Sequence, residues 1–329
     1  MNTNKEMTYG EWIALYLDAY RRYGIRDTSF RQLELIRDLI NPALLSKPLC
    51  DLMPFELQRF INQFCTEASE SYANKMYSLI RSSLNRAFEN HLTYDNLSSN
   101  LSFPHRHKQP HVWLSTDEAI CILSFAERFP SHPAAEKMNP RTRIFISVAV
   151  STLIFLGLRR GELLGLKYSD LDIEHYILHI RRGVRVDKRG HAYVVDGEAK
   201  NEISIADLAI SDEIGKWLLS IPRCGDFIFS TNIGTIYNPR NFNRLYDKFI
   251  SAFLEEHPKL TKRITPHVSR HTTATLMLKS GVDVRIVQRQ LRHASIKTTM
   301  RYTHPDLEDL QIAQTRYREY LKKSSLDRV

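Results

Sequence analysis

The apolar positions of the first hundred residues recur at helical spacing. A capping-box pattern at residues 8–11 opens an apolar stripe that contains Trp12 and is closed by Gly24. Strand-like alternation is almost absent from this part of the chain, so it predicts a small helical domain. Further helical patterns, with a break at 41–42, cover about 29–40, 54–68 and 70–90.

Between residues 97 and 110 the chain turns polar and the periodicity is lost. We expect a helical domain over 1–103, a linker over 104–113 and a second domain over 114–329. Arg106 and Lys108 lie in this linker, where they either cross a phosphate backbone or belong to an exposed hinge.

The second domain is predicted to be helical at both ends, with a strand-rich segment between them. A capping box at 115–118 opens a helix to about residue 129, and an apolar helix over 141–157 ends at Gly157. Alternation from 171 to 205, with a turn at 187–190, predicts a small antiparallel sheet of three strands. An extended segment is expected at 227–230, and helices at about 211–219, 240–256, 265–281, 284–291, 295–302 and 306–323.

The apolar run at 144–158 is too short to span a bilayer, which needs about 20 residues. We therefore expect a buried core helix there, and no membrane association. The first ten residues lack an apolar signal region, so no export is indicated. The expected location is therefore cytoplasmic.

Charge indicates the class of partner. The 329 residues carry a formal net charge of +9, and residues 259–304 hold ten Lys or Arg, four His and a single acid, Asp283. So much positive charge on a folded segment predicts a polyanionic partner, namely nucleic acid.

No cofactor is expected. The four cysteines lie far apart and have no metal-ligand spacing, so free thiols in a reducing compartment are the natural interpretation. The chain also lacks a phosphate-loop motif and clustered acids for Mg²⁺. His267 and His271 have the spacing of a zinc helix, but Val268 stands where a metalloprotease needs Glu. The cysteines are Cys50, Cys65, Cys121 and Cys224.

The start of the helix over 265–281 has the features of an anion site. Thr265 and Pro266 form a helix start, and Gly281 is the left-handed residue that ends the helix. His267 and Arg270, three residues apart, then share one face of the first turn. The free N–H groups of a helix N-terminus add to their attraction for an anion.

These residues belong to a longer pattern, His-x-x-Arg-His followed by a histidine and then Tyr-x-His, which resembles the tyrosine recombinases of the phage integrase family. Residues 157–163 match the family's first arginine box. They precede the histidine pattern by somewhat over a hundred residues, which is the separation found in the family. One departure is Arg292, which stands where the family usually has glycine. The matching residues are Arg159, Glu162, His267, Arg270, His271, His293, Tyr302 and His304.

The resemblance implies the two-domain architecture of the DNA-breaking–rejoining enzymes, with a helical core-binding (SAM-like) domain before the catalytic domain. It implies that Tyr302 is the nucleophile and that Lys200, on the hairpin, is a catalytic residue. Two arginines can clamp a phosphate bidentately, the role expected of Arg159 and Arg270. His267 and His293 are expected to donate to the phosphate or assist proton transfer, and which of them is the base stays open. Supporting residues are Glu162, His271 and His304, and expected DNA contacts are Arg106, Lys108, Arg160, Lys262, Arg263 and Arg292.

The expected function is site-specific recombination of double-stranded DNA. A homo-tetramer would join strands through a 3′-phosphotyrosine and a four-way junction, without metal or ATP. The helix at about 306–323 would dock on a neighbouring protomer, and accessory DNA-bending or directionality proteins are further partners. Integration or excision of a mobile element is the first expectation. The alternatives are resolution of chromosome or plasmid dimers, a topoisomerase-like enzyme, and a DNA-binding protein of this fold that does not cut.

Overall fold

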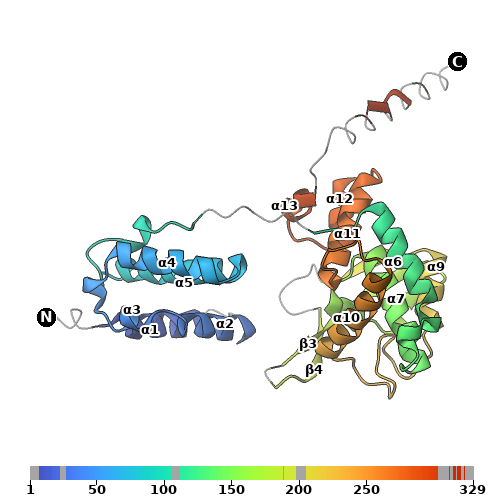
Figure 1. Cartoon of the computed structure of the whole chain (residues 1–329), viewed down its shortest axis with the longest axis horizontal. Coiled ribbons are helices and arrows are strands. Elements are labelled where there is room, and N and C mark those ends of the chain that lie inside the picture. The colour runs from blue at the N-terminus through green and yellow to red at the C-terminus, as the bar shows by residue number, and fades with distance from the viewer. Residues whose placement is uncertain are drawn as a thin grey trace. The chain divides into compact units, whose positions relative to one another are not determined.

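The computed structural model describes residues 7–22, 27–104, 112–187, 189–197 and 205–302, together with 311, 314–315, 317–319 and 322. Contacts within the chain divide it into two compact units, Met1–Gln109 and Pro110–Val329. Helices dominate both units, and the strands of the described residues all lie in the second (Figure 1). The expected fold class, mainly α with small antiparallel sheets, is confirmed.

The first unit packs its helices around α5 (Glu70–Glu89), which contacts α1, α2 and α4. Trp12 of α1 is buried in this core, where its Nε1 donates to the carbonyl oxygen of Ser83 at 2.9 Å. The capping box is confirmed, because the N–H of Thr8 donates to Oε2 of Glu11 at 2.8 Å and the reciprocal bond is present. The other helices are α1 (Tyr9–Arg22), α2 (Asp27–Arg37), α3 (Pro42–Leu45), α4 (Pro54–Glu67) and the 3-10 turns η1 (Leu49–Asp51) and η2 (Leu97–Asn100).

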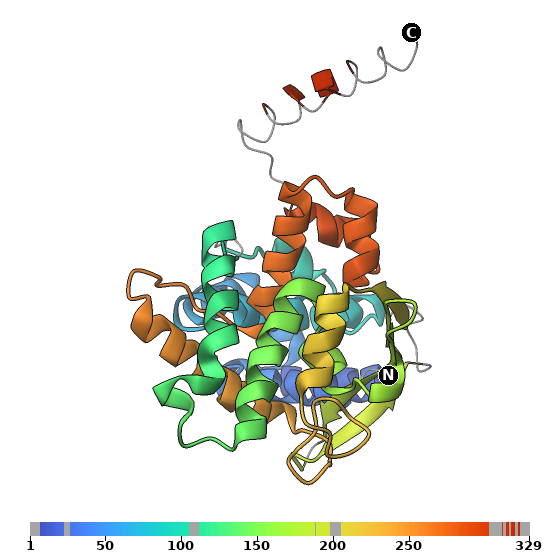
Figure 2. The ribbon, with the colours of Figure 1, turned by 90° about the vertical axis from the view of Figure 1, so that its right-hand side faces the viewer.

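The second unit is arranged around α7 (Pro140–Leu156), most of whose residues are buried (Figure 2). This helix contains nearly all of the apolar run, and α6, α8, α9, α10 and α11 all contact it. No helix in the described part of the chain is long and apolar enough to cross a membrane. The surrounding helices are α6 (Thr116–Arg128), α8 (Arg160–Leu164), α9 (Asp212–Ser220), α10 (Pro239–Glu256), α11 (Pro266–Lys279), α12 (Val284–Leu291) and α13 (Ile296–Thr299), with 3-10 turns η3 (Phe129–Ser131), η4 (Pro133–Ala135), η5 (Tyr168–Asp170) and η7 (Met300–Tyr302).

Within the described residues the strands form two small sheets, where the sequence predicted one sheet of three strands. One is antiparallel in the order β1-β2-β5, and the other is the β3-β4 hairpin. The prediction of a single sheet is wrong because β2 pairs with β5, which comes later in the chain. Leu178 of β2 and Leu208 of β5 are partners in this pairing, and both are buried. The strands are β1 (Leu171–Asp172), β2 (Ile177–Ile180), β3 (Arg182–Val186), β4 (Ala192–Asp196) and β5 (Ala206–Ala209).

Gly157 ends α7 in the left-handed conformation, with a φ of 60°. A Cβ at this position would lie 2.5 Å from Cδ2 of Leu291 and 3.2 Å from the Thr273 side chain. Glycine is therefore required here both for its backbone conformation and for the close approach of α11 and α12. This junction brings the end of α7 to the expected site residues.

Candidate active site

Helix α11 carries three of the predicted site residues in its first turns. Thr265 caps the helix through its Oγ1, which accepts the N–H of the third residue after it at 3.3 Å, and Pro266 is the first helical residue, as predicted. Arg270 is only 3% exposed, whereas His267 is exposed and His271 is half-buried. Spacings of three and four residues keep the three side chains close together on the helix.

Arg270 is held by two backbone carbonyls from distant parts of the chain. Its Nη1 donates to the carbonyl oxygen of Gly157 at 2.6 Å, and its Nη2 donates to that of Leu291. Burial, followed by the charge of Arg159, lowers the pKa of Arg270 to about 9, so the guanidinium stays charged at neutral pH. A buried cation beside a second arginine is an unfavourable arrangement that a bound anion would relieve.

Arg159 is the residue that precedes α8, and Glu162 of the same helix holds it. Nη1 of Arg159 donates to Oε1 of Glu162 at 2.7 Å, and its backbone N–H donates to Oε2 at 2.8 Å. The Arg159 side chain is 49% exposed, so its guanidinium remains accessible from solvent. Burial alone would raise the pKa of Glu162, but the charges of Arg292 and Arg159 hold it below its usual range.

Helix α12 ends in a turn that places Arg292 and His293. The N–H of Arg292 donates to the carbonyl of Arg289, and the N–H of His293 donates to that of Gln288, both at 3.1 Å. This pair of bonds defines a Schellman motif, whose penultimate residue has a left-handed backbone. Arg292 has a φ of 53°, which explains why glycine is usual at this position in the family that the sequence resembles.

His293 is buried, 9% exposed, at the end of this turn. Its Nδ1 is hydrogen-bonded to Oγ1 of Thr299 at 2.9 Å. Burial, followed by the charges of Arg270, Arg159 and Arg292, lowers the pKa of His293 to about 4. The imidazole is therefore neutral at pH 7, with one N–H donor and one acceptor nitrogen.

Tyr302 lies in the turn η7 and meets the histidines of α11. Its hydroxyl is hydrogen-bonded to Nδ1 of His271, and the two ring centroids are 5.2 Å apart. The ring also stacks on His293, at 6.3 Å between centroids and an interplanar angle of 21°. His267 contacts His271 edge to face at 4.3 Å. Tyrosine, three histidines and two arginines thus form one site.

The predicted DNA-contacting residues have different environments. Arg160 is half-buried and donates to Oδ1 of Asn243 at 2.7 Å, and Lys262 pairs with Glu118 at 2.6 Å, whereas Arg263 is exposed. Arg292 was predicted as a DNA contact. This assignment needs correction, because its side chain is only 2% exposed and pairs with Glu162 at 2.6 Å. Several residues with a predicted role lie outside the described part of the chain, namely Arg106, Lys108, Lys200, His304 and most of 306–323.

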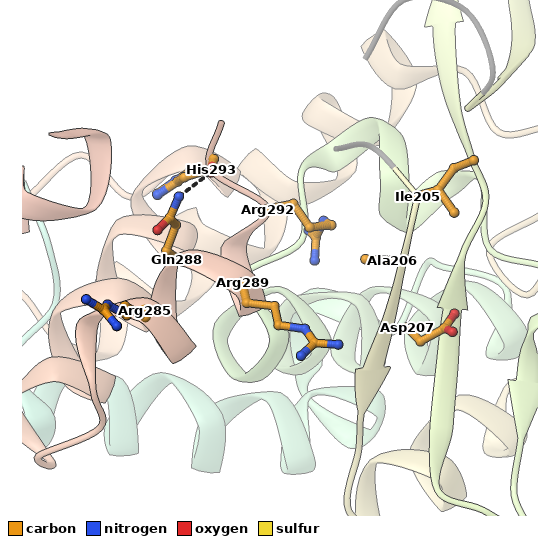
Figure 3. Close-up of a pocket in the computed structure, with 8 residues that line it drawn as sticks. All are labelled: Ile205, Ala206, Asp207, Arg285, Gln288, Arg289, Arg292 and His293. Carbon is orange, nitrogen blue, oxygen red and sulfur yellow. Dashed lines mark hydrogen bonds between the residues drawn. The ribbon is translucent and has the colours of Figure 1, made fainter. Parts of the chain in front are cut away.

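A pocket of about 370 Å³ lies beside His293, between α12 and β5 (Figure 3). Arg285 and Arg289, exposed on α12, line it together with Asp207 of β5. The sequence analysis did not single out these two arginines, although their spacing of four residues on a helix was a usable signal. No motif marks the Thr299 hydroxyl as the partner of His293, and the backbone carbonyls of Gly157 and Leu291 leave no trace in side-chain type.

The arrangement suits a tetrahedral oxyanion with a nucleophile beside it. Arg159 and Arg270 supply planar, bidentate donors, and the Tyr302 hydroxyl has a histidine as its proton partner. Across the described ranges, no three His, Cys, Asp or Glu side chains are grouped as metal ligands. The chemistry that these side chains can perform themselves is transfer of a phosphoryl group to a phenol.

Comparison with known proteins identifies the class. Residues 113–308 match the model of the phage integrase family. A tyrosine recombinase of Agathobacter rectalis is 26% identical over 305 residues, which cover 89% of this chain and 91% of that protein. The chain belongs to the phage integrase family and is a tyrosine recombinase.

Solved structures agree on the fold. The Tn1549 transposon integrase in complex with a circular intermediate DNA superposes with a TM-score of 0.76 at 17% identity, over 94% of this chain and 99% of that one. A lambda integrase tetramer bound to a Holliday junction gives a TM-score of 0.64 at 18% identity, over 93% and 81%. At these identities the likeness establishes the shared architecture.

Proposed function

We propose that this protein is a site-specific DNA recombinase that cleaves and rejoins double-stranded DNA through a covalent 3′-phosphotyrosine at Tyr302. The observation that carries the proposal is the hydrogen bond between the Tyr302 hydroxyl and His271, in the same site as Arg159 and Arg270. A tyrosine that served only for packing would have no reason to place its hydroxyl on a histidine in a site with two arginines. Membership of the phage integrase family supports the same function.

Arg159 and Arg270 would bind the two non-bridging oxygens of the scissile phosphate. A phosphodiester resists attack because these oxygens repel the nucleophile and gain charge in the transition state, which fixed guanidinium groups stabilise. Arg270 is suited to this task because the carbonyls of Gly157 and Leu291 fix its plane before substrate arrives. His293, neutral at pH 7 and held through Nδ1 by Thr299, would donate from Nε2 to the same phosphate.

In the cleavage step the oxygen of Tyr302 attacks phosphorus, and the bond from phosphorus to the 5′ oxygen breaks. The phenolic proton passes to a histidine, and His271 is the histidine in contact with the hydroxyl. The leaving 5′ oxygen takes a proton and departs as a hydroxyl. We assign that proton to Lys200, by the family resemblance alone.

Rejoining reverses these steps. A 5′ hydroxyl from another strand attacks the phosphotyrosine, and Tyr302 recovers its proton. The phosphotyrosine ester conserves the energy of the broken bond, so the cycle consumes no ATP. The arginines supply the charge stabilisation that a divalent ion supplies elsewhere, so we expect cleavage in the presence of EDTA.

We further propose that a tetramer exchanges strands pairwise through a four-way junction, with the segment at about 306–323 docking on a neighbouring protomer. Residues 1–103 would act as the helical DNA-binding domain, 104–113 as a linker on the phosphate backbone and 114–329 as the catalytic domain. Arg106, Lys108, Arg160, Lys262 and Arg263 would contribute phosphate contacts. The protein would act in the cytoplasm, on the nucleoid, with DNA-bending or directionality proteins as accessory partners.

Integration or excision of a mobile element is our proposed biological reaction, and resolution of chromosome or plasmid dimers is the alternative. A plasmid that carries two directly repeated target sites distinguishes these two reactions. Efficient deletion between identical sites with no other protein favours resolution, whereas a requirement for two different sites favours integration.

The chemistry is tested with duplexes that the protein selects from a random pool, each nicked at successive positions so that cleavage releases a short 5′-hydroxyl fragment. Wild type and Tyr302→Phe are incubated with these duplexes in EDTA and run on denaturing gels. A covalent protein–DNA band that requires Tyr302 supports the proposal.

Two other results would overturn it. DNA retardation on native gels by both proteins, without any covalent band, would identify a binding protein that does not cut. A band that forms only with added Mg²⁺ would show that the two arginines are insufficient.

A further inference from the structure

Arg292 occupies a backbone position where an arginine is unfavourable. It is the left-handed residue of the Schellman motif at the end of α12, with a φ of 53°. A side chain in this conformation costs about 1–2 kcal/mol, and glycine avoids the cost. His91 shows the same motif at the end of α5, with a φ of 56°, but its side chain is exposed.

The Arg292 side chain is also buried. Its Nη1 donates to the carbonyl oxygen of Gln290 at 2.8 Å and its Nη2 to Oε2 of Glu162 at 2.6 Å, while Nε is buried with no hydrogen-bond partner among the described residues. An unsatisfied donor adds about 1–3 kcal/mol to the cost of this arrangement. The contact with Glu162 is the interaction that sets Arg292 apart from a surface arginine.

Glu162 lies between two arginines. Its Oε1 accepts from Arg159 at 2.7 Å and its Oε2 accepts from Arg292 at 2.6 Å. Nη2 of Arg159 also donates to the carbonyl oxygen of Arg292, at 3.4 Å. Both terminal nitrogens of Arg159 are therefore held. Nη1 binds the carboxylate of Glu162, which Arg292 also binds, and Nη2 binds the backbone carbonyl of Arg292.

The formal charges of this group show a second effect. A pair of Arg159 and Glu162 alone is neutral, which would weaken the attraction of Arg159 for a phosphate. With Arg292 the three side chains sum to +1, and Arg270 raises the sum to +2. A buried carboxylate shared by two guanidinium groups can thus orient Arg159 without cancelling the charge of the site.

We infer that Arg292 is a positioning residue for strand cleavage: it shares Glu162 with Arg159, so that Arg159 is oriented towards the phosphate and the site remains positive. The inference rests on the proposed function. The hydrogen bonds of Arg292 go to Gln290 and Glu162 and not to Tyr302, and its buried side chain lies on the α12 side of the pocket (Figure 3).

His293 gives this role a measurable signature, because it directly follows Arg292. The charged and titratable groups that act on it are Arg270 and His267 of α11, Arg159 just before α8 and Arg292 just after α12. Thr299 binds its Nδ1, and the Tyr302 ring stacks on it. Loss of the Arg292 charge should raise the pKa of His293 towards its ordinary value.

The test compares Arg292→Lys, Arg292→Met and Arg292→Gly with wild type in the cleavage assay across pH. Lys and Met both keep a side chain on the left-handed backbone, so the pair isolates the charge, whereas Gly removes the charge and the backbone strain together. His91→Gly is the matched control, since it relieves the same strain in the same motif, on a helix of the first unit.

We expect Arg292→Met and Arg292→Gly to slow cleavage about ten- to a hundredfold, because Arg159 is misplaced. Both should move the acidic limb of the pH profile upwards. Arg292→Lys should recover most of the rate, and His91→Gly should cleave like wild type. Equal rates and pH profiles for Arg292→Met and wild type would overturn the inference.

Adding Glu162→Gln distinguishes this role from a general effect on stability. When Glu162 carries no charge, Arg292→Met should cause a smaller further loss than it does alone. Fully additive losses in the double variant would argue that Arg292 acts independently of Glu162.

NMR titration of ¹³C-labelled histidine provides a readout that needs no DNA. The His293 resonance, assigned with His293→Asn, should titrate at higher pH in Arg292→Met than in wild type. This shift is expected even if the protein proves unable to cleave DNA, in which case the proposed function fails and the contact described here stands. An unchanged titration would overturn the inference even in an active enzyme.

Discussion

Arg270 donates to the carbonyl oxygen of Gly157 at 2.6 Å across 113 residues of sequence. This bond joins the second arginine of the site to the end of the most buried helix, α7. Because the second bond of Arg270 reaches the end of α12, one guanidinium fixes the meeting point of three helices. Loss of this side chain should therefore affect structure and chemistry together.

We expect Arg270→Lys to abolish most cleavage, because lysine has no planar fork to hold two carbonyls and bind phosphate. The cleavage rate should fall about a hundred- to a thousandfold, the typical loss for one donor to a transition state. The control is Arg141→Lys, since Arg141 is also buried and donates to backbone carbonyls, at Pro222 and Ser230, away from the site. Arg141→Lys should lower the midpoint of thermal unfolding but leave the cleavage rate of the folded protein unchanged. Equal loss of cleavage in both variants would contradict the specific role.

His271→Phe should slow covalent complex formation about a hundredfold, within the range typical of general acid–base catalysis. Phenylalanine retains a planar ring beside Tyr302 but removes the hydrogen bond from its hydroxyl to Nδ1. Affinity for uncleaved DNA, measured by native gel retardation, should not change. The residual rate is compared with Tyr302→Phe as background. A wild-type rate would show that another histidine receives the proton.

Acid should destabilise the protein through His293. The pKa of this side chain is about 4 in the folded protein, against about 6.5 when unfolded. As pH falls from about 6.5 to 4, His293 becomes protonated in the unfolded chain but stays neutral in the folded protein. The free energy of unfolding therefore decreases by up to about 3 kcal/mol. Above pH 6.5 both states are neutral and the contribution is fully present. Urea unfolding of wild type and His293→Asn at pH 7 and pH 4.5 should show a smaller acid loss in the variant, and an equal loss would refute this assignment.

Gly157→Ala should destabilise the second unit by at least about 2 kcal/mol, from the left-handed backbone together with the overlap with Leu291. It should also reduce cleavage, because Gly157 and Leu291 provide the carbonyls that hold Arg270. Gly190→Ala is the matched control. Its φ is 91°, but its nearest neighbour is the flexible end of Arg240 at 3.2 Å, so only the backbone cost of about 1 kcal/mol applies. Chemical denaturation and the cleavage assay, run on both variants, separate the two effects.

Local signals in the sequence predicted much of the fold. The capping boxes at Thr8 and Ser115, the helix end at Gly157, the left-handed Gly281 and the Thr265-Pro266 helix start are all confirmed, because each depends on a few adjacent residues. The pairing of β2 with β5 was missed, since nothing in the alternation of a strand specifies which distant strand it joins.

The sequence predicted which residues belong to the site, but not which of them are in contact with one another. Motif spacing alone could not select His271 over His267 or His293 as the partner of Tyr302, because that choice depends on where η7 lies against α11. Arg292 was predicted to contact DNA, and no local pattern indicated that its side chain is buried, which is rare for a long charged residue. Its burial follows from Glu162, which lies 130 residues earlier in the chain.

The two bonds of Arg270 cannot both form until the chain has been synthesised as far as Leu291. Arg159 is synthesised early in the catalytic unit, whereas the segment that includes Leu291, His293 and Tyr302 is synthesised late. Since chains emerge from their N-terminus and domains fold as units, a partly made chain holds the first arginine without its nucleophile. An incomplete chain that lacks Tyr302 therefore cannot form the proposed phosphotyrosine, whatever its affinity for DNA.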